Sequence, residues 1–134
     1  MTSPTTVLVV DDESSLRTLV SRRLVNEGYH VLEASNGLEA LELLQAPDAD
    51  IRLVITDIRM PHMDGYELAD RLVDRPKSPP IVFISGYGQS GVWLPGSVFA
   101  KPFSLDALMD EVRRLLAAGK TGPANSARRR GATA

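Results

Sequence analysis

The 134-residue sequence contains no cysteine and no apolar run long enough to cross a membrane. The absence of cysteine excludes thiol nucleophiles, cysteine-ligated zinc and disulfide bonds, and it fits a reducing compartment. Residues 1–6 carry neither the basic patch nor the apolar stretch of a secretory signal, and a membrane helix needs about 20 apolar residues. We therefore expect a cytoplasmic protein with no membrane partner.

Basic residues are also scarce over most of the chain. Residues 1–119 hold 11 Lys and Arg against 17 Asp and Glu, whereas residues 120–134 hold four basic residues and no acidic one. Binding to nucleic acid depends on many Lys and Arg contacts with phosphates. Arg128–Arg130 could contact DNA, but three arginines without a folded module make few contacts. The composition therefore argues against a DNA partner, and we favour a solubilising or disordered end.

Continuous apolar runs indicate the strands of a parallel sheet. Three such runs cover residues 5–10, 51–56 and 80–84, and weaker strands are predicted at 30–34 and 98–100. Continuous rather than alternating apolar residues are typical of parallel strands that are covered on both faces. Segments with apolar residues at helical spacing lie between them, so strand and helix alternate. The pattern predicts a single α/β domain with five parallel strands.

Several residues mark the predicted ends of helices and of the domain. Asn36 and Ser104 are expected N-caps, and Gly28 is expected to stop the first helix. Residues 85–97 hold four glycines and a proline, which favours a loop or a single turn over a full helix.

The predicted domain covers residues 5–118. Residues 1–4 would be a short extension, and residues 119–134, which have no apolar face, are expected to form a disordered basic tail.

Polar side chains stand where four of the predicted strands end. Asp11 and Asp12 follow the first run, Asp57 follows the run at 51–56, and Ser85 and Lys101 follow the last two strands. The carboxyl ends of parallel strands meet at one edge of a sheet, where α/β folds place their chemistry. We therefore expect one small polar site.

Three carboxylates this close would repel one another unless a cation lay between them. Mg2+ prefers oxygen ligands and keeps several waters, so Asp12 and Asp57 could bind it directly, Asp11 through water, and a backbone carbonyl could add a ligand. Asp57 could then attack a phosphoryl group as a carboxylate nucleophile. Lys101 would neutralise a phosphoryl oxygen, and the Ser85 hydroxyl could donate to another.

Each of these residues also has a purely structural interpretation. Asp11 or Asp12 could cap a helix, Lys101 could be a surface lysine, and Ser85 could be a turn residue. Asp64, before Gly65, is better explained as a helix cap or part of a tight turn. Taken together, however, the residues at the strand ends favour a phosphoryl-transfer site.

Four short motifs resemble the receiver domains of two-component response regulators. They are Val-Val-Asp-Asp-Glu at 9–13, Thr-Asp-Ile-Arg-Met-Pro-His-Met-Asp-Gly at 56–65, Ile-Ser-Gly at 84–86 and Ala-Lys-Pro-Phe at 100–103. They occur in order and at matching spacing, and the resemblance covers residues 5–118. It implies a doubly wound, flavodoxin-like sheet of order 2-1-3-4-5.

The resemblance also assigns roles to the acidic residues. By similarity, Asp57 accepts a phosphoryl group from a phosphohistidine on a sensor histidine kinase or a histidine phosphotransfer protein. Asp12, Asp57 and the Arg59 carbonyl would hold Mg2+, with Asp11 acting through water. The protein would catalyse only its own phosphorylation and dephosphorylation, and so would not be an enzyme in the usual sense.

For the remaining site residues, the resemblance implies that Ser85 and Lys101 bind the phosphoryl oxygens and that the Lys101–Pro102 bond is cis. Two features depart from the family pattern. In most receivers, an aromatic residue three positions before the lysine changes rotamer when the Ser or Thr engages the phosphoryl group. Here that position is Val98, with Phe99 next to it, so the switch residues implied by the resemblance are Ser85, Val98 and Phe99. The interval from Ser85 to Lys101 is short, so the family's fourth helix should be shortened or absent, and the partner surface that it helps to form should be remodelled.

Several other interpretations remain open. Haloacid-dehalogenase-like phosphatases also use a nucleophilic Asp, but they place an acid/base Asp two residues later, where this chain has Arg59. A degenerate receiver would act by protein contacts alone. Only 16 residues follow Ala118, so we expect a stand-alone receiver or one from a hybrid kinase, with an unknown downstream protein.

Overall fold

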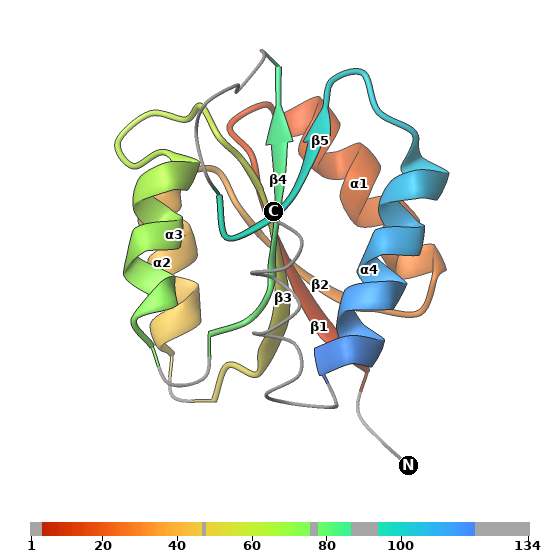
Figure 1. Cartoon of the computed structure of the whole chain (residues 1–134), viewed down its shortest axis with the longest axis horizontal. Helices are drawn as coiled ribbons and strands as arrows, with labels where there is room; N and C mark the ends of the chain where they lie inside the picture. Colours follow the sequence, from red (N-terminus) through yellow and green to blue (C-terminus); the bar gives the residue numbers. More distant parts are fainter. Residues whose placement is uncertain (1–3, 47, 76–77, 87–93, 120–134) are drawn as a thin grey trace.

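The computed structural model describes residues 4–46, 48–75, 78–86 and 94–119 (Figure 1). The predicted basic tail lies outside these ranges except for Gly119, and so do the predicted extension before Pro4 and most of the Gly-rich loop. In the described part of the chain, no helix has both the length and the apolar character needed to cross a bilayer.

Five parallel strands form one sheet in the order β2-β1-β3-β4-β5, which confirms the predicted doubly wound fold. The strands are β1 (Thr6–Val10), β2 (His30–Ala34), β3 (Ile51–Asp57), β4 (Ile81–Ser85) and β5 (Gly96–Ala100). The helices are α1 (Ser14–Asn26), α2 (Gly37–Gln45), α3 (Gly65–Val73) and α4 (Leu105–Gly119).

Helices cover both faces of the sheet, with α2 and α3 on one side and α1 and α4 on the other (Figure 1). The continuous apolar runs explain this arrangement, because successive side chains of a strand point to opposite faces. In β1, Leu8 and Val10 join the core beneath α2 and α3, whereas Val7 and Val9 join the core beneath α1 and α4. Both faces of the central strands are therefore buried.

The predicted helix ends are confirmed. The side chain of Asn36 accepts a hydrogen bond from the Glu39 N–H at 3.0 Å, and the Ser104 hydroxyl accepts one from the Ala107 N–H at 3.1 Å. Gly28, which follows the end of α1, has a φ of 101°, a conformation that favours glycine. Asp64 is the N-cap of α3, as its structural interpretation predicted.

Between β4 and β5 the described residues, which are Gly86, Leu94 and Pro95, contain no helix. β5 begins at Gly96, two residues earlier than predicted. A Cβ on Gly96 would lie 2.0 Å from the Ile81 carbonyl oxygen, so glycine allows β5 to approach β4 there. Because of this close approach, β5 is longer than the apolar segment at 98–100 that predicted it.

Candidate functional site

The sheet brings the predicted polar residues to one edge. Asp57 and Ser85 are the last residues of β3 and β4, and Asp11 and Lys101 directly follow β1 and β5. Because the strands are parallel, their carboxyl ends share this edge. Residues separated by up to 90 positions in the chain are thus placed around one site.

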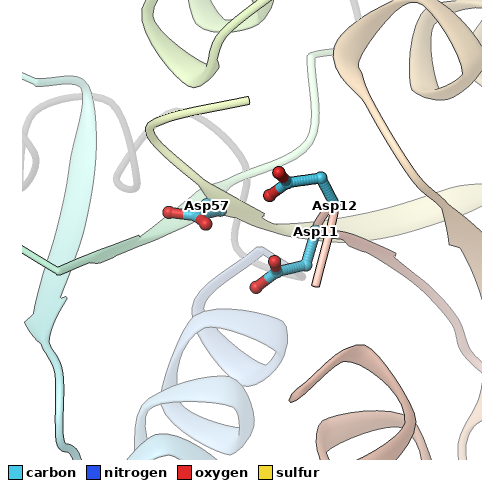
Figure 2. A group of neighbouring side chains, drawn as sticks. All are labelled: Asp11, Asp12 and Asp57. Atoms are coloured by element: carbon cyan, nitrogen blue, oxygen red, sulfur yellow. The ribbon is translucent and has the colours of Figure 1, made fainter. Parts of the chain in front are cut away.

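Three carboxylates form the centre of the site. Oxygen atoms of Asp11, Asp12 and Asp57 lie within 4.8 Å of one another (Figure 2). Asp11 and Asp57 are buried, whereas Asp12 is exposed. The donor set consists of carboxylate oxygens, which suits a hard cation such as Mg2+, and one side of the cluster stays open to water.

Asp11 and Asp12 are not the N-cap of α1. That position belongs to Glu13, whose side chain makes no capping hydrogen bond in the described part of the chain. The Glu13 N–H instead donates to Asp11 Oδ1 at 2.9 Å, while Arg17 donates to the Asp11 backbone oxygen at 2.6 Å. These contacts hold Asp11 in place and leave Asp12 turned to the solvent side.

Burial raises the pKa of the Asp11 carboxyl from 3.8 to about 6. Burial is the largest cause of this rise, the charges of Asp57 and Asp12 add to it, and the Glu13 N–H and the Lys101 charge oppose it. The ionised form of Asp11 is therefore destabilising when no cation is bound.

Replacing Asp11 with asparagine should stabilise the metal-free protein at pH 7 by about 2–3 kcal/mol, since the rise of the pKa from 3.8 to about 6 corresponds to about 3 kcal/mol before solvent screening is taken into account. A pKa raised in the folded state means that folding favours the protonated acid. The penalty of ionised Asp11 is thus absent below pH 3.8 and is fully present only above about pH 6. Urea unfolding in the presence of EDTA should show a gain in the free energy of unfolding for Asp11→Asn, and this gain should shrink as the pH falls from 7 to 4.

The exposed neighbour supplies the control for this prediction. Asp12→Asn removes a charge from the same cluster, but this carboxylate is exposed. Its gain in the free energy of unfolding should therefore be smaller than that of Asp11→Asn. Equal gains for the two variants, or a gain for Asp11→Asn that does not change with pH, would contradict the assigned burial penalty.

Lys101 pairs with one of the three carboxylates. Its Nζ donates to Asp57 Oδ2 at 3.4 Å, and its backbone N–H donates to the Ser85 carbonyl at 2.7 Å. Ser85 is buried, and the Lys101–Pro102 bond is cis, as the resemblance implies. The ammonium group therefore lies beside Asp57.

The loop after β3 is packed closely beneath Asp57. The Ile58 N–H donates to the Ile84 carbonyl at 3.0 Å, and the Gly65 N–H donates to the Ile58 carbonyl at 2.7 Å. A Cβ on Gly65 would lie 2.6 Å from the Asp57 carbonyl oxygen. Arg59, two positions after Asp57, is exposed. The sequence indicated only a turn or a helix start at Gly65 and carried no signal of its packing against Asp57.

Val98 and Phe99 face different environments. Val98 is 45% exposed on β5, whereas Phe99 packs against the core beneath α1 and α4. The Phe99 ring meets that of Phe103 edge-on, with the centroids 6.4 Å apart and the planes at 71°. This pair brackets Lys101 in the sequence, and Phe103 was not among the predicted switch residues.

A groove of about 430 Å3 adjoins the site between the start of α1 and the segment after β5. Leu16 and Leu19 form one wall, and Lys101, Phe103 and Leu105 form much of the other. Leu19 is half exposed. An apolar surface thus leads directly to the lysine beside Asp57.

Residues 7–113 match the family model of the response regulator receiver domain, and the chain belongs to this family. It is 35% identical over 118 residues to the response regulator receiver protein CpdR of Brucella abortus, covering 84% of this chain and 97% of CpdR. It is 36% identical over 117 residues to the sensor kinase CckA of the same organism, covering 83% of this chain but only 12% of CckA.

Among solved structures, a similar one is the response regulator TrrA of Thermotoga maritima, crystallised in complex with Mg(2+)-BeF. The TM-score is 0.74 at 34% identity, covering 83% of this chain and 98% of TrrA. The chain is thus similar to a short receiver protein over almost its whole length and to one part of a much longer kinase.

Proposed function

We propose that this protein is a phosphoacceptor of a two-component system or phosphorelay and that Asp57 receives the phosphoryl group. The observation that carries the proposal is the position of Asp57 at the end of β3, between two further carboxylates and the Lys101 ammonium. A phosphoryl acceptor needs a carboxylate nucleophile with positive charge arranged around it.

Asp12, Asp57 and the Arg59 carbonyl would hold Mg2+, with Asp11 acting through water. The ion would neutralise charge on the phosphoryl oxygens during transfer. The oxygen-rich cluster and the raised pKa of Asp11 support this assignment, because both indicate an acidic site that a cation would stabilise. TrrA, which was crystallised with Mg(2+)-BeF, supports it by similarity.

In the proposed reaction, a carboxylate oxygen of Asp57 attacks the phosphorus of a phosphohistidine. The new O–P bond gives an acyl phosphate, the N–P bond breaks, and the imidazole leaves. Lys101, whose ammonium group contacts Asp57 Oδ2, would instead donate a hydrogen bond to a phosphoryl oxygen, and the Ser85 hydroxyl would donate to another. The protein would convert no small-molecule substrate.

The donor would be a sensor histidine kinase or a histidine phosphotransfer protein. A donor must bring its phosphohistidine to Asp57, and the groove beside Lys101 is where an apolar helix face could rest while doing so. Leu19 would be buried on docking. The downstream partner would be another protein, and the cytoplasmic location stays a prediction.

Intact mass spectrometry after incubation with Mg2+ and a small phosphodonor tests the proposal. We expect a single phosphoryl adduct that is absent when EDTA replaces Mg2+. If the folded protein binds Mg2+ but forms no adduct, the degenerate receiver becomes the correct interpretation. Turnover of small phosphoesters would favour the phosphatase interpretation, although Arg59 offers no carboxylate for acid/base chemistry.

A further inference from the structure

One edge of the sheet ends in an open strand. Within the described residues, β2 pairs only with β1. The His30 N–H donates to the Thr5 carbonyl, and the Ala34 carbonyl accepts from the Asp11 N–H, so these two residues bond toward β1. Backbone groups alternate in direction along a parallel strand, so Val31 and Glu33 direct their N–H and C=O groups outward. An open edge of this kind is a template for another strand.

A groove of about 360 Å3 runs beside this edge, between α1 and β2. Val31 and Glu33 line it from β2, and Arg22 and Val25 line it from α1. Val25 is 56% exposed, which is the largest exposure among the large apolar side chains of the described residues. The groove thus combines an exposed apolar side chain with backbone groups that lack a neighbouring strand.

Two polar side chains of the groove, those of Ser21 and Arg22, lack a partner within the described residues. The Ser21 hydroxyl is buried and has no hydrogen-bond partner among the described residues. Arg22 is exposed and makes no ion pair within that part of the chain, whereas Glu33 pairs with Arg17 at 3.0 Å. If a binding partner placed a carboxylate next to Val31, that carboxylate could pair with the Arg22 guanidinium group.

We propose that β2 pairs with β2 of a second copy of this chain to form an antiparallel, two-fold symmetric dimer. Pairing about Leu32 sets Val31 of one copy opposite Glu33 of the other, with both side chains on the α1 side. Arg22 lines the groove at Val31, so the second copy's Glu33 meets this arginine, and the symmetry repeats the contact. The exposed Val25 side chains lie along the same seam.

The dimer is a weak one. A single five-residue edge with one helix face provides less area than standard stable interfaces, which bury about 1,600 Å2 in total. It uses none of the phosphoacceptor residues, so it does not depend on the proposed function of Asp57.

Sedimentation equilibrium of the full chain, from about 10 µM to about 1 mM, tests the proposal. The weight-average mass should rise from that of the 14.6 kDa monomer toward twice that value. Arg22→Glu and Glu33→Arg should each remain monomeric over the same range. An equimolar mixture of the two variants should dimerise again, because both contacts between Arg22 and Glu33 positions then join opposite charges.

Unfolding midpoints establish that each variant folds, which matters for Glu33→Arg because Glu33 also pairs with Arg17. In the wild type, the amide hydrogens of Val31 and Glu33 should exchange more slowly as the concentration rises. The proposal would be overturned by a wild type that stays monomeric at 1 mM, by dimers that persist in both single variants, or by folded variants whose mixture stays monomeric.

Discussion

Asp57→Asn should show no phosphoryl adduct under conditions in which the wild type is fully modified. The substitution preserves the size of the side chain but replaces the carboxylate nucleophile with an amide. It also removes the negative charge that pairs with Lys101 Nζ at 3.4 Å. Intact mass after incubation with Mg2+ and a small phosphodonor measures the loss directly.

Asp64→Asn is the matched control for this experiment. Asp64 caps α3 by accepting a hydrogen bond from the Glu67 N–H at 2.9 Å, and asparagine caps a helix equally well. Its adduct should therefore match that of the wild type. An adduct retained in Asp57→Asn would show that another side chain accepts the phosphoryl group and would reject the assigned site.

Gly65→Ala should lower the free energy of unfolding by about 2–3 kcal/mol, the scale of overpacking in a well-packed interior. The added Cβ would lie 2.6 Å from the Asp57 carbonyl oxygen and 3.0 Å from Ile58 Cα. Backbone atoms at these distances cannot rotate away as a flexible side chain can, so the end of β3 must shift. Urea unfolding would measure the lost stability, and the initial rate of adduct formation would measure the displacement of Asp57.

Gly86→Ala provides the comparison at the neighbouring strand end. Among the described residues, its added Cβ would meet only Lys101 Cδ, at 3.8 Å, which is an ordinary contact. Its stability should therefore stay within about 0.5 kcal/mol of the wild type. If Gly65→Ala were as stable and as rapidly phosphorylated as Gly86→Ala, the close packing beneath Asp57 would not be positioning it.

Several parts of the fold could be predicted from the sequence because their causes are local. The apolar runs that became β1, β3 and β4 are continuous, as burial on both faces requires. Asn36 and Ser104 cap helices through bonds to residues three positions away. Gly28 adopts the positive φ that a helix end favours.

The candidate site was also predictable, because it follows from topology. Once the strands were expected to be parallel, the residues at their carboxyl ends had to share one edge, and this brought Asp57 and Lys101 together across 44 positions. The start of β5 was less accessible to prediction, since Gly96 extends the strand by its close approach to Ile81.

The sequence by itself thus determined the order of strands and helices and the residue types at the sheet edge, because periodicity and capping act over a few neighbouring positions. Only the tertiary structure decided how strongly Asp11 is buried, that Gly65 packs against Asp57, and that β2 carries a groove beside an open edge. Those properties depend on contacts between segments far apart in the chain, and a linear pattern does not contain such distances.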